Sequence, residues 1–225
     1  GAFTLTGNAD LNGDLDVDGT TNLDVVDIDG ALTQDGGAVF NEAGADVDFR
    51  VETSGNQNML FVDAGSNHIS IGTGTDYDAV LNVLSTDNNK TLSLVSTDTD
   101  ANAGPVLALT RQSSSSAADG DVLGRVDFEG LNDANQQVAY GRMQTFIRDA
   151  SDGSEDGTVQ INHIIAGTER VALELDNDEY VFNNAGIDID FRVESSGNAN
   201  MLFVDSGNDR VGIGTTTTNS ILHAA

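Results

Sequence analysis

Two stretches of 35 residues decide how this chain folds: VFNEAGADVDFRVETSGNQNMLFVDAGSNHISIGT at 39–73 and VFNNAGIDIDFRVESSGNANMLFVDSGNDRVGIGT at 181–215. They align without a gap at an offset of 142, and 24 of the 35 positions are identical. Identity of this extent indicates an internal duplication, in which one stem motif recurs on either side of a long insert.

Each stem motif predicts three short β-strands. The first copy alternates apolar and charged residues over 47–51, is apolar on both faces over 59–62, and alternates again over 69–71. Alternation with a period of two is the pattern of a half-buried strand, and Gly-containing turns separate the three segments.

Strands of this length are only marginally stable by themselves, so we expect the stems to be completed by other chains. Three chains wound about one axis would supply the shared core. Either Leu60 and Val62, or alternatively Met59 and Phe61, would then fill that axis.

The first 38 residues carry a different period. Apolar residues recur six apart at Leu5, Leu11, Val17 and Leu23, with glycines between them. A six-residue period is typical of a parallel β-helix, and thirty residues are too few for a β-helix of one chain. An interwound trimer would supply enough residues for a shared core here as well.

The insert predicts a small antiparallel β-sandwich or jelly-roll-like knob, because short strand patterns alternate with turn segments. The strand patterns lie at Leu81 and Val83, Leu92 and Leu94, Val106 to Leu109, Val122 to Phe128, Val138 to Ile147, Val159 to Ile165, and Val171 to Leu175.

We therefore predict an all-β fold, a trimeric fibre in which short, interwound, β-helix-like stems flank a sandwich-like knob. The predicted parts are a β-helical shaft at 1–38, the first stem at 39–75, the knob at 76–180, the second stem at 181–217, and the start of a further unit at 218–225.

Charge excludes several classes of partner. The chain has 37 acidic and 9 basic residues, for a formal net charge of −28, and this field repels nucleic acids and anionic membranes. No Cys is present, so the sequence offers no disulfide and no thiolate metal site. Oligomerisation is the usual route by which a small β domain without disulfides gains stability.

One acidic motif suggests a cation. Asp14, Asp16, Asp18 and Gly19 open like an EF-hand loop, but Val25 stands where the twelfth position needs Glu. We favour solvent-facing carboxylates. The alternative is that three chains place these aspartates around a common axis, where they would attract Ca²⁺ or another cation.

No cofactor and no catalytic residue is expected. The chain lacks a nucleophile elbow, a phosphate-binding loop and a dinucleotide fingerprint. Its histidines have no partner at metal-ligand spacing. His163 is in phase with Val159 and Ile161 and is expected in a core, whereas His68 is expected at the surface.

The phrase DFRVESSGNANMLFVDSGNDRVGIGT at 190–215, followed by Leu222 and His223, resembles segments of bacteriophage tail-fibre and other virion fibre proteins, especially those of marine phages. Residues 104–175 are similar to domains of such proteins, through the motifs at 118–121, 128–130, 140–142 and 152–157.

This resemblance implies an extracellular virion protein, a homotrimer that contacts other virion proteins and acts as a shaft positioning host-attachment elements. Three alternatives remain. The chain could be a receptor- or glycan-binding module that uses the loops at 113–121 or 149–157, a bacterial or archaeal surface filament, or a depolymerase.

Overall fold

The chain folds entirely into β-structure, and no helix occurs in the part that the structure describes. This computed structural model describes residues 6–8, 12–14, 16–18, 26–101, 104–112 and 116–224. The chain consists of two compact units, Gly1–Val95 and Ser96–Ala225. The all-β prediction is confirmed.

The first unit contains one four-stranded sheet with the order β1-β2-β3-β4. Its strands are β1 (Phe49–Thr53), β2 (Asn56–Asp63), β3 (His68–Ile71) and β4 (Leu81–Val83). The first three pair antiparallel, and β4 pairs parallel to β3 after a crossover. Residues 81–83 therefore belong to the sheet of the first stem, although the sequence pattern assigned them to the insert.

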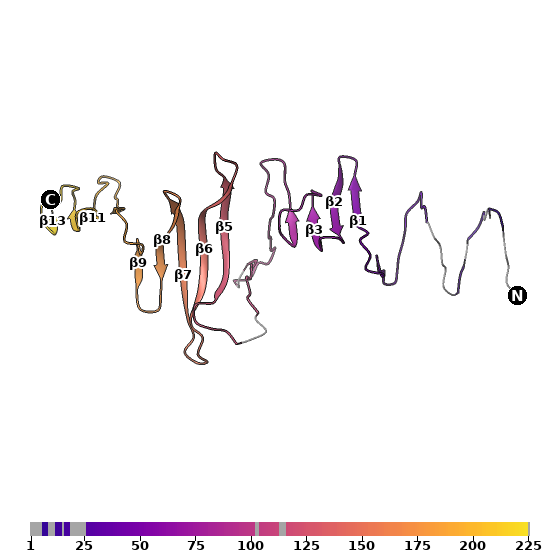
Figure 1. Cartoon of the computed structure of the whole chain (residues 1–225), viewed down its shortest axis with the longest axis horizontal. Helices are drawn as coiled ribbons and strands as arrows, with labels where there is room; N and C mark the ends of the chain where they lie inside the picture. The colour runs from indigo at the N-terminus through magenta and orange to yellow at the C-terminus, as the bar shows by residue number, and fades with distance from the viewer. Residues whose placement is uncertain are drawn as a thin grey trace. The chain divides into compact units, whose positions relative to one another are not determined.

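The second unit begins with a five-stranded sheet in which each strand pairs antiparallel with the next along the chain (Figure 1). Its strands are β5 (Val122–Leu131), β6 (Gln137–Asp149), β7 (Asp156–Ile165), β8 (Thr168–Leu175) and β9 (Tyr180–Phe182). The tight turn from β7 to β8 has positive φ at both Ala166 and Gly167, which matches the twist of a two-residue hairpin.

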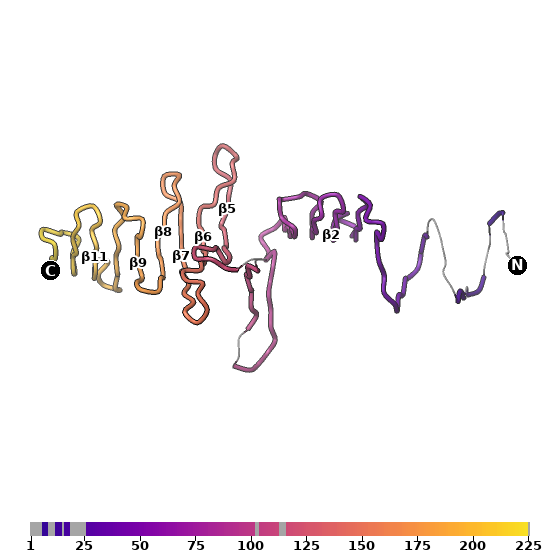
Figure 2. Tube along the Cα trace, turned by 60° about the horizontal axis from the view of Figure 1, so that its bottom comes forward, coloured from indigo at the N-terminus to yellow at the C-terminus, as the bar shows by residue number. Residues whose placement is uncertain are grey.

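The predicted sandwich is wrong for a single chain. The insert forms one sheet, and its short connections join neighbouring strands without a crossover to a second layer. The expected strands at 92–94 and 106–109 are described, but they pair with no strand in the described chain. Figure 2 shows β5 to β9 lying side by side in chain order within the second unit.

The second stem repeats the first. Its strands are β10 (Phe191–Val193), β11 (Leu202–Asp205), β12 (Arg210–Ile213) and β13 (Leu222–Ala224), again with a parallel final pair. Each stem thus has a fourth strand that was not predicted for it.

The six-residue period falls mostly outside the described residues, because Leu5, Leu11 and Leu23 are not described. The described residues before Phe49 contain no strand. The β-helical shaft stays a prediction.

Candidate self-association surface

An apolar row crosses the entire five-stranded sheet. The strand register places Val126 opposite Met143, Met143 opposite Ile161, Ile161 opposite Leu173, and Leu173 opposite Phe182. Directly paired residues project from the same face, so these five side chains form one band across all five strands. Val159 and Leu175 extend it in the neighbouring row.

This band faces solvent in the single chain. Met143 is 47% exposed and Ile161, on the central strand, is 39% exposed. Central-strand aliphatic residues ordinarily lie in a core. The band therefore lacks the layer that would cover it.

The opposite face of the same sheet carries polar side chains that form ion pairs and hydrogen bonds with one another. Arg142 Nε lies 2.6 Å from Asp127 Oδ1, and Arg142 Nη1 lies 2.9 Å from Glu169 Oε2. Asn162, only 4% exposed, donates to Glu169 Oε1 at 2.6 Å. The hydrogen bond to Asp127 raises the pKa of Arg142. This face needs no apolar cover.

A second group on that face joins β6, β7 and β8. Gln144 donates to Gln160 at 3.0 Å, Gln160 donates to Glu174, and Thr158 donates to Asp176 at 2.9 Å. Asn177, through its backbone N–H, and Thr158 hold the pKa of Asp176 below its ordinary value. These bonds link strands across the face that carries no apolar band.

Each stem sheet likewise has one uncovered apolar face and one opposite face that is completed within the chain. In the first stem, two rows on one face are entirely apolar: Val51, Leu60, Ile71 and Val83 form one, and Phe49, Val62, Ile69 and Leu81 form the other. Several of these side chains are exposed. Leu60 and Val62, rather than Met59 and Phe61, therefore belong to the uncovered apolar face.

The other face of each stem is covered by its own chain. Ser70 and Asn82 are buried there beside Phe61, and the Asn82 amide donates to Ala79 O, in the crossover to β4, at 3.1 Å. In the second stem Phe203 occupies the place of Phe61 and is 7% exposed. It is the one buried large apolar residue of the described chain.

The two stems also share their side-chain-to-backbone hydrogen bonds. Asn56 donates to Gly72 O at 2.9 Å, and Asn198 donates to Gly214 O at 3.3 Å. At the first strand of each stem, the ring centroids of Phe40 and Phe49 lie 5.0 Å apart, as do those of Phe182 and Phe191. The duplication therefore extends from sequence to local geometry.

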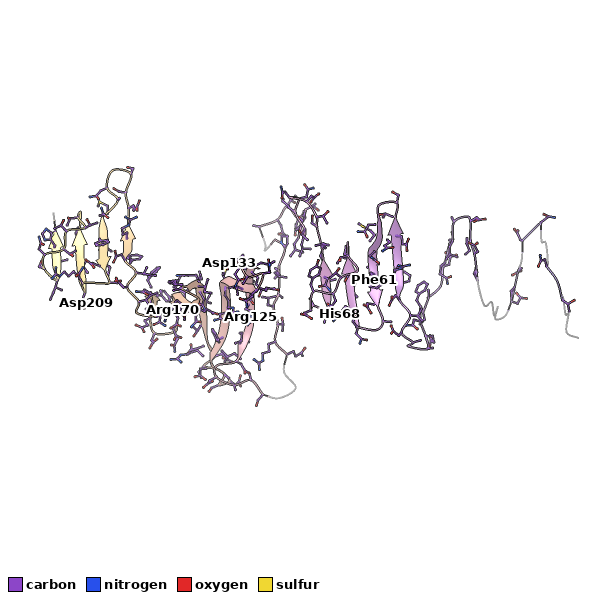
Figure 3. The ribbon with its side chains drawn as sticks, turned by 45° about the horizontal axis from the view of Figure 1, so that its top comes forward. Phe61, His68, Arg125, Asp133, Arg170 and Asp209 are labelled. Carbon is purple, nitrogen blue, oxygen red and sulfur yellow. The ribbon has the colours of Figure 1, made fainter. Side chains whose placement is uncertain are left out.

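Aspartates close the turn before the third strand of each stem. Ser66 and Asn208 donate hydrogen bonds to Asp63 and Asp205, and these bonds hold the pKa of each carboxyl below its ordinary value. The turns contain Asn67 and Asp209, both with positive φ (Asp209 is labelled in Figure 3).

One of the sequence differences between the stems changes a contact. His68 Nδ1 lies 2.9 Å from Asp76 Oδ2, without the geometry of a hydrogen bond, whereas its counterpart Arg210 donates to Thr218 O (Figure 3 labels His68). The His68 side chain is only 21% exposed. His68, which was expected at the surface, is therefore half-buried beside Asp76.

A groove of about 490 Å³ opens on the polar face of the five-stranded sheet. It is lined by Phe146, Arg148, Gln160 and Glu174 among others. Its size is in the range of small-ligand sites, and its walls combine hydrogen-bonding groups with one aromatic ring.

The predicted cation ligands show no cluster. Asp14, Asp16 and Asp18 are described and exposed, and within the described ranges no group of three acidic or His side chains is placed to hold a metal ion. A ring contributed by three chains stays a prediction. His163 lies on the apolar face with Ile161, as its phase predicted, and is half-buried.

Comparison with models of protein families and with curated proteins finds no match to this chain. Across the described residues, no helix is long and apolar enough to cross a membrane. The features that bear on function are therefore the uncovered apolar faces of the sheets and the duplicated stem.

Proposed function

We propose that this chain is a structural subunit of a homotrimeric fibre shaft, extracellular and part of a phage virion, which positions host-attachment elements. The observation that carries the proposal is that every sheet has an uncovered apolar face: the band on the five-stranded sheet and the apolar rows on the two stems. Three copies would turn these bands toward a common interior and leave the polar faces outside.

Another copy of the same chain is the partner that fits best. A covering partner must present apolar area to each of the three sheets. A second and third copy meet that requirement automatically. Closed rotational symmetry is also the usual arrangement of homo-oligomers.

Charge opposes this assembly without preventing it. Each chain carries −28, but none of the residues in the apolar rows is charged. The repulsion therefore acts between the outer faces, where salt screens it over about 10 Å at 0.1 M ionic strength. We expect the assembly to be more stable at high salt.

The experiment is a measurement of native mass by light scattering, in 0.5 M salt and at decreasing protein concentration. The proposal predicts a stable species of three times 23.4 kDa. A stable monomer would contradict it, and a dimer would contradict the three-fold arrangement. Electron microscopy of the same sample should then show thin rods.

A second candidate is a glycan-binding module, which the groove beside Phe146 and Arg148 favours. Amide, carboxylate and guanidinium groups suit a hydroxyl-rich ligand. Binding of the assembled protein to a glycan array, lost in Arg148→Ala, would support it. Absence of binding would count against the module and leave the shaft proposal intact.

A further inference from the structure

The segment just before β5 has the pattern of a strand but no strand partner. Residues 105–110 read PVLALT, and Val106, Leu107 and Leu109 are all exposed. No backbone hydrogen bond joins residues 106–110 to another described residue. Among the described residues, the side chains of Val106 and Leu107 and the backbone of 106–110 have no partner strand.

Specific contacts nevertheless hold the segment in place. Arg111 Nη2 lies 3.0 Å from Asp121 Oδ1, and Arg111 Nη1 donates to Val122 O at 3.3 Å. Leu109 packs on β5, where a Cβ added to Gly124 would lie only 2.7 Å from Leu109 Cβ. Only glycine leaves room for Leu109 there.

These contacts put the segment at the border of the apolar band. Gly124 and Val126 are two residues apart on β5, opposite Thr145 and Met143, so they project from the same face. Leu109 thus covers the β5 end of its own apolar face, while Val106 and Leu107 remain uncovered.

We propose that residues 105–110 are buried between two copies of the chain, with Val106 and Leu107 against the apolar band of the second copy. The inference rests on the proposed self-association and names one of its contacts. Residues 104–110 contain no charged side chain, and neither does the band, so this contact escapes the repulsion between the chains.

Burial has a consequence for the backbone. Unpaired N–H and C=O groups removed from water are costly, so the segment must hydrogen-bond to the second copy. Exposed apolar alternation beside unpaired backbone groups is the usual template for pairing between chains. The strand predicted from the sequence would then form only in the assembly.

Cross-linking between two chains tests the contact, because the protein has no Cys of its own. Leu107→Cys and Met143→Cys are made in separate chains with different affinity tags, refolded together, and treated with a short bismaleimide. Each chain has one thiol, so any product with both tags joins two chains. Ala134→Cys, in the exposed turn beside Asp133 (Figure 3), replaces Met143→Cys in the control.

Hydrogen exchange of the unsubstituted protein supplies an independent measurement. The amides of 106–110 should exchange at least about tenfold more slowly in the assembly than in an unfolded peptide. The inference requires both this protection and a cross-link from residue 107 to residue 143 that clearly exceeds the control.

Absence of either result from a protein that does assemble overturns the inference and leaves the shaft proposal standing. A chain that stays monomeric contradicts the shaft proposal first, and the inference with it. The measured mass therefore distinguishes the two failures.

Discussion

The five-stranded sheet and the two stem sheets differ in how each completes the face opposite its apolar rows. The stems cover that face with their own crossover, and a few side-chain amides tie the connection to the strands. The five-stranded sheet has no crossover, and a network of charged and amide side chains occupies that face. All three sheets leave the apolar face uncovered.

An uncovered apolar face is therefore common to all three sheets. The opposite face of each sheet is stabilised by contacts within the same chain. Substitutions on apolar faces should therefore change assembly. Substitutions on the opposite faces should change the stability of one region and leave the number of chains unaltered.

The largest effect is expected for Ile161→Asp, at the centre of the band. A charge buried between copies without a partner is strongly unfavourable, so the substitution should abolish assembly. Native mass checks this. The matched control is the adjacent Gln160→Asp, on the polar face, which should still assemble. Equal behaviour of the two variants would contradict the assignment of faces.

A smaller effect is expected for Arg142→Ala. It removes two charge-assisted contacts and leaves the carboxylates of Asp127 and Glu169 less well paired, at a cost of about 2 kcal/mol. Thermal unfolding should show a lower midpoint at unchanged native mass. Arg125→Ala, which removes only a more exposed pair with Asp127, should cost less.

Asn198→Ala should cost about 1 kcal/mol, because a hydrogen bond to Gly214 O is lost. The first stem provides the comparison, since Asn56→Ala removes the equivalent bond to Gly72 O. We expect similar losses in thermal stability. A loss confined to one stem would show that the repeats are not energetically equivalent.

The smallest effect is expected for Asp205→Asn, on the stability of the protein at acid pH. The pKa of Asp205 is lowered on folding, so the folded chain binds fewer protons than the unfolded chain below the ordinary value of 3.8. Its contribution is present above that pH and is lost as the pH falls through the lowered pKa. Asp205→Asn should flatten the pH dependence of the melting temperature below about pH 4. An unchanged slope would contradict this role.

The sequence predicts the stem strands well, because Val51 and Ile71 lie in short alternating runs and Phe61 lies in a short apolar run, all bounded by turns. It predicts poorly which strands share a sheet. The alternation at 81–83 is the same whether that strand joins the stem or the insert, and only the parallel pairing with β3 decides.

The sandwich prediction failed for a related reason. Alternation at Val159 and Ile161 shows that one face is apolar, but not what covers it. A second sheet of the same chain and a sheet from another copy leave the same pattern. The polar network was missed because Arg142 lies 27 residues before Glu169 in the sequence. Arg142, Asn162 and Glu169 meet only through the register of β6, β7 and β8.

The three methionines report which sheet face is covered in the assembly. Met59, Met143 and Met201 are 45%, 47% and 46% exposed in the single chain, but only Met143 lies in an apolar row. Oxidation by hydrogen peroxide, followed by peptide mass spectrometry, compares them in one sample. The account predicts that Met143 is oxidised several-fold more slowly than Met59 and Met201 in the native protein and equally fast in urea. Equal rates in the native protein, or protection of Met59 and Met201 instead, would contradict it.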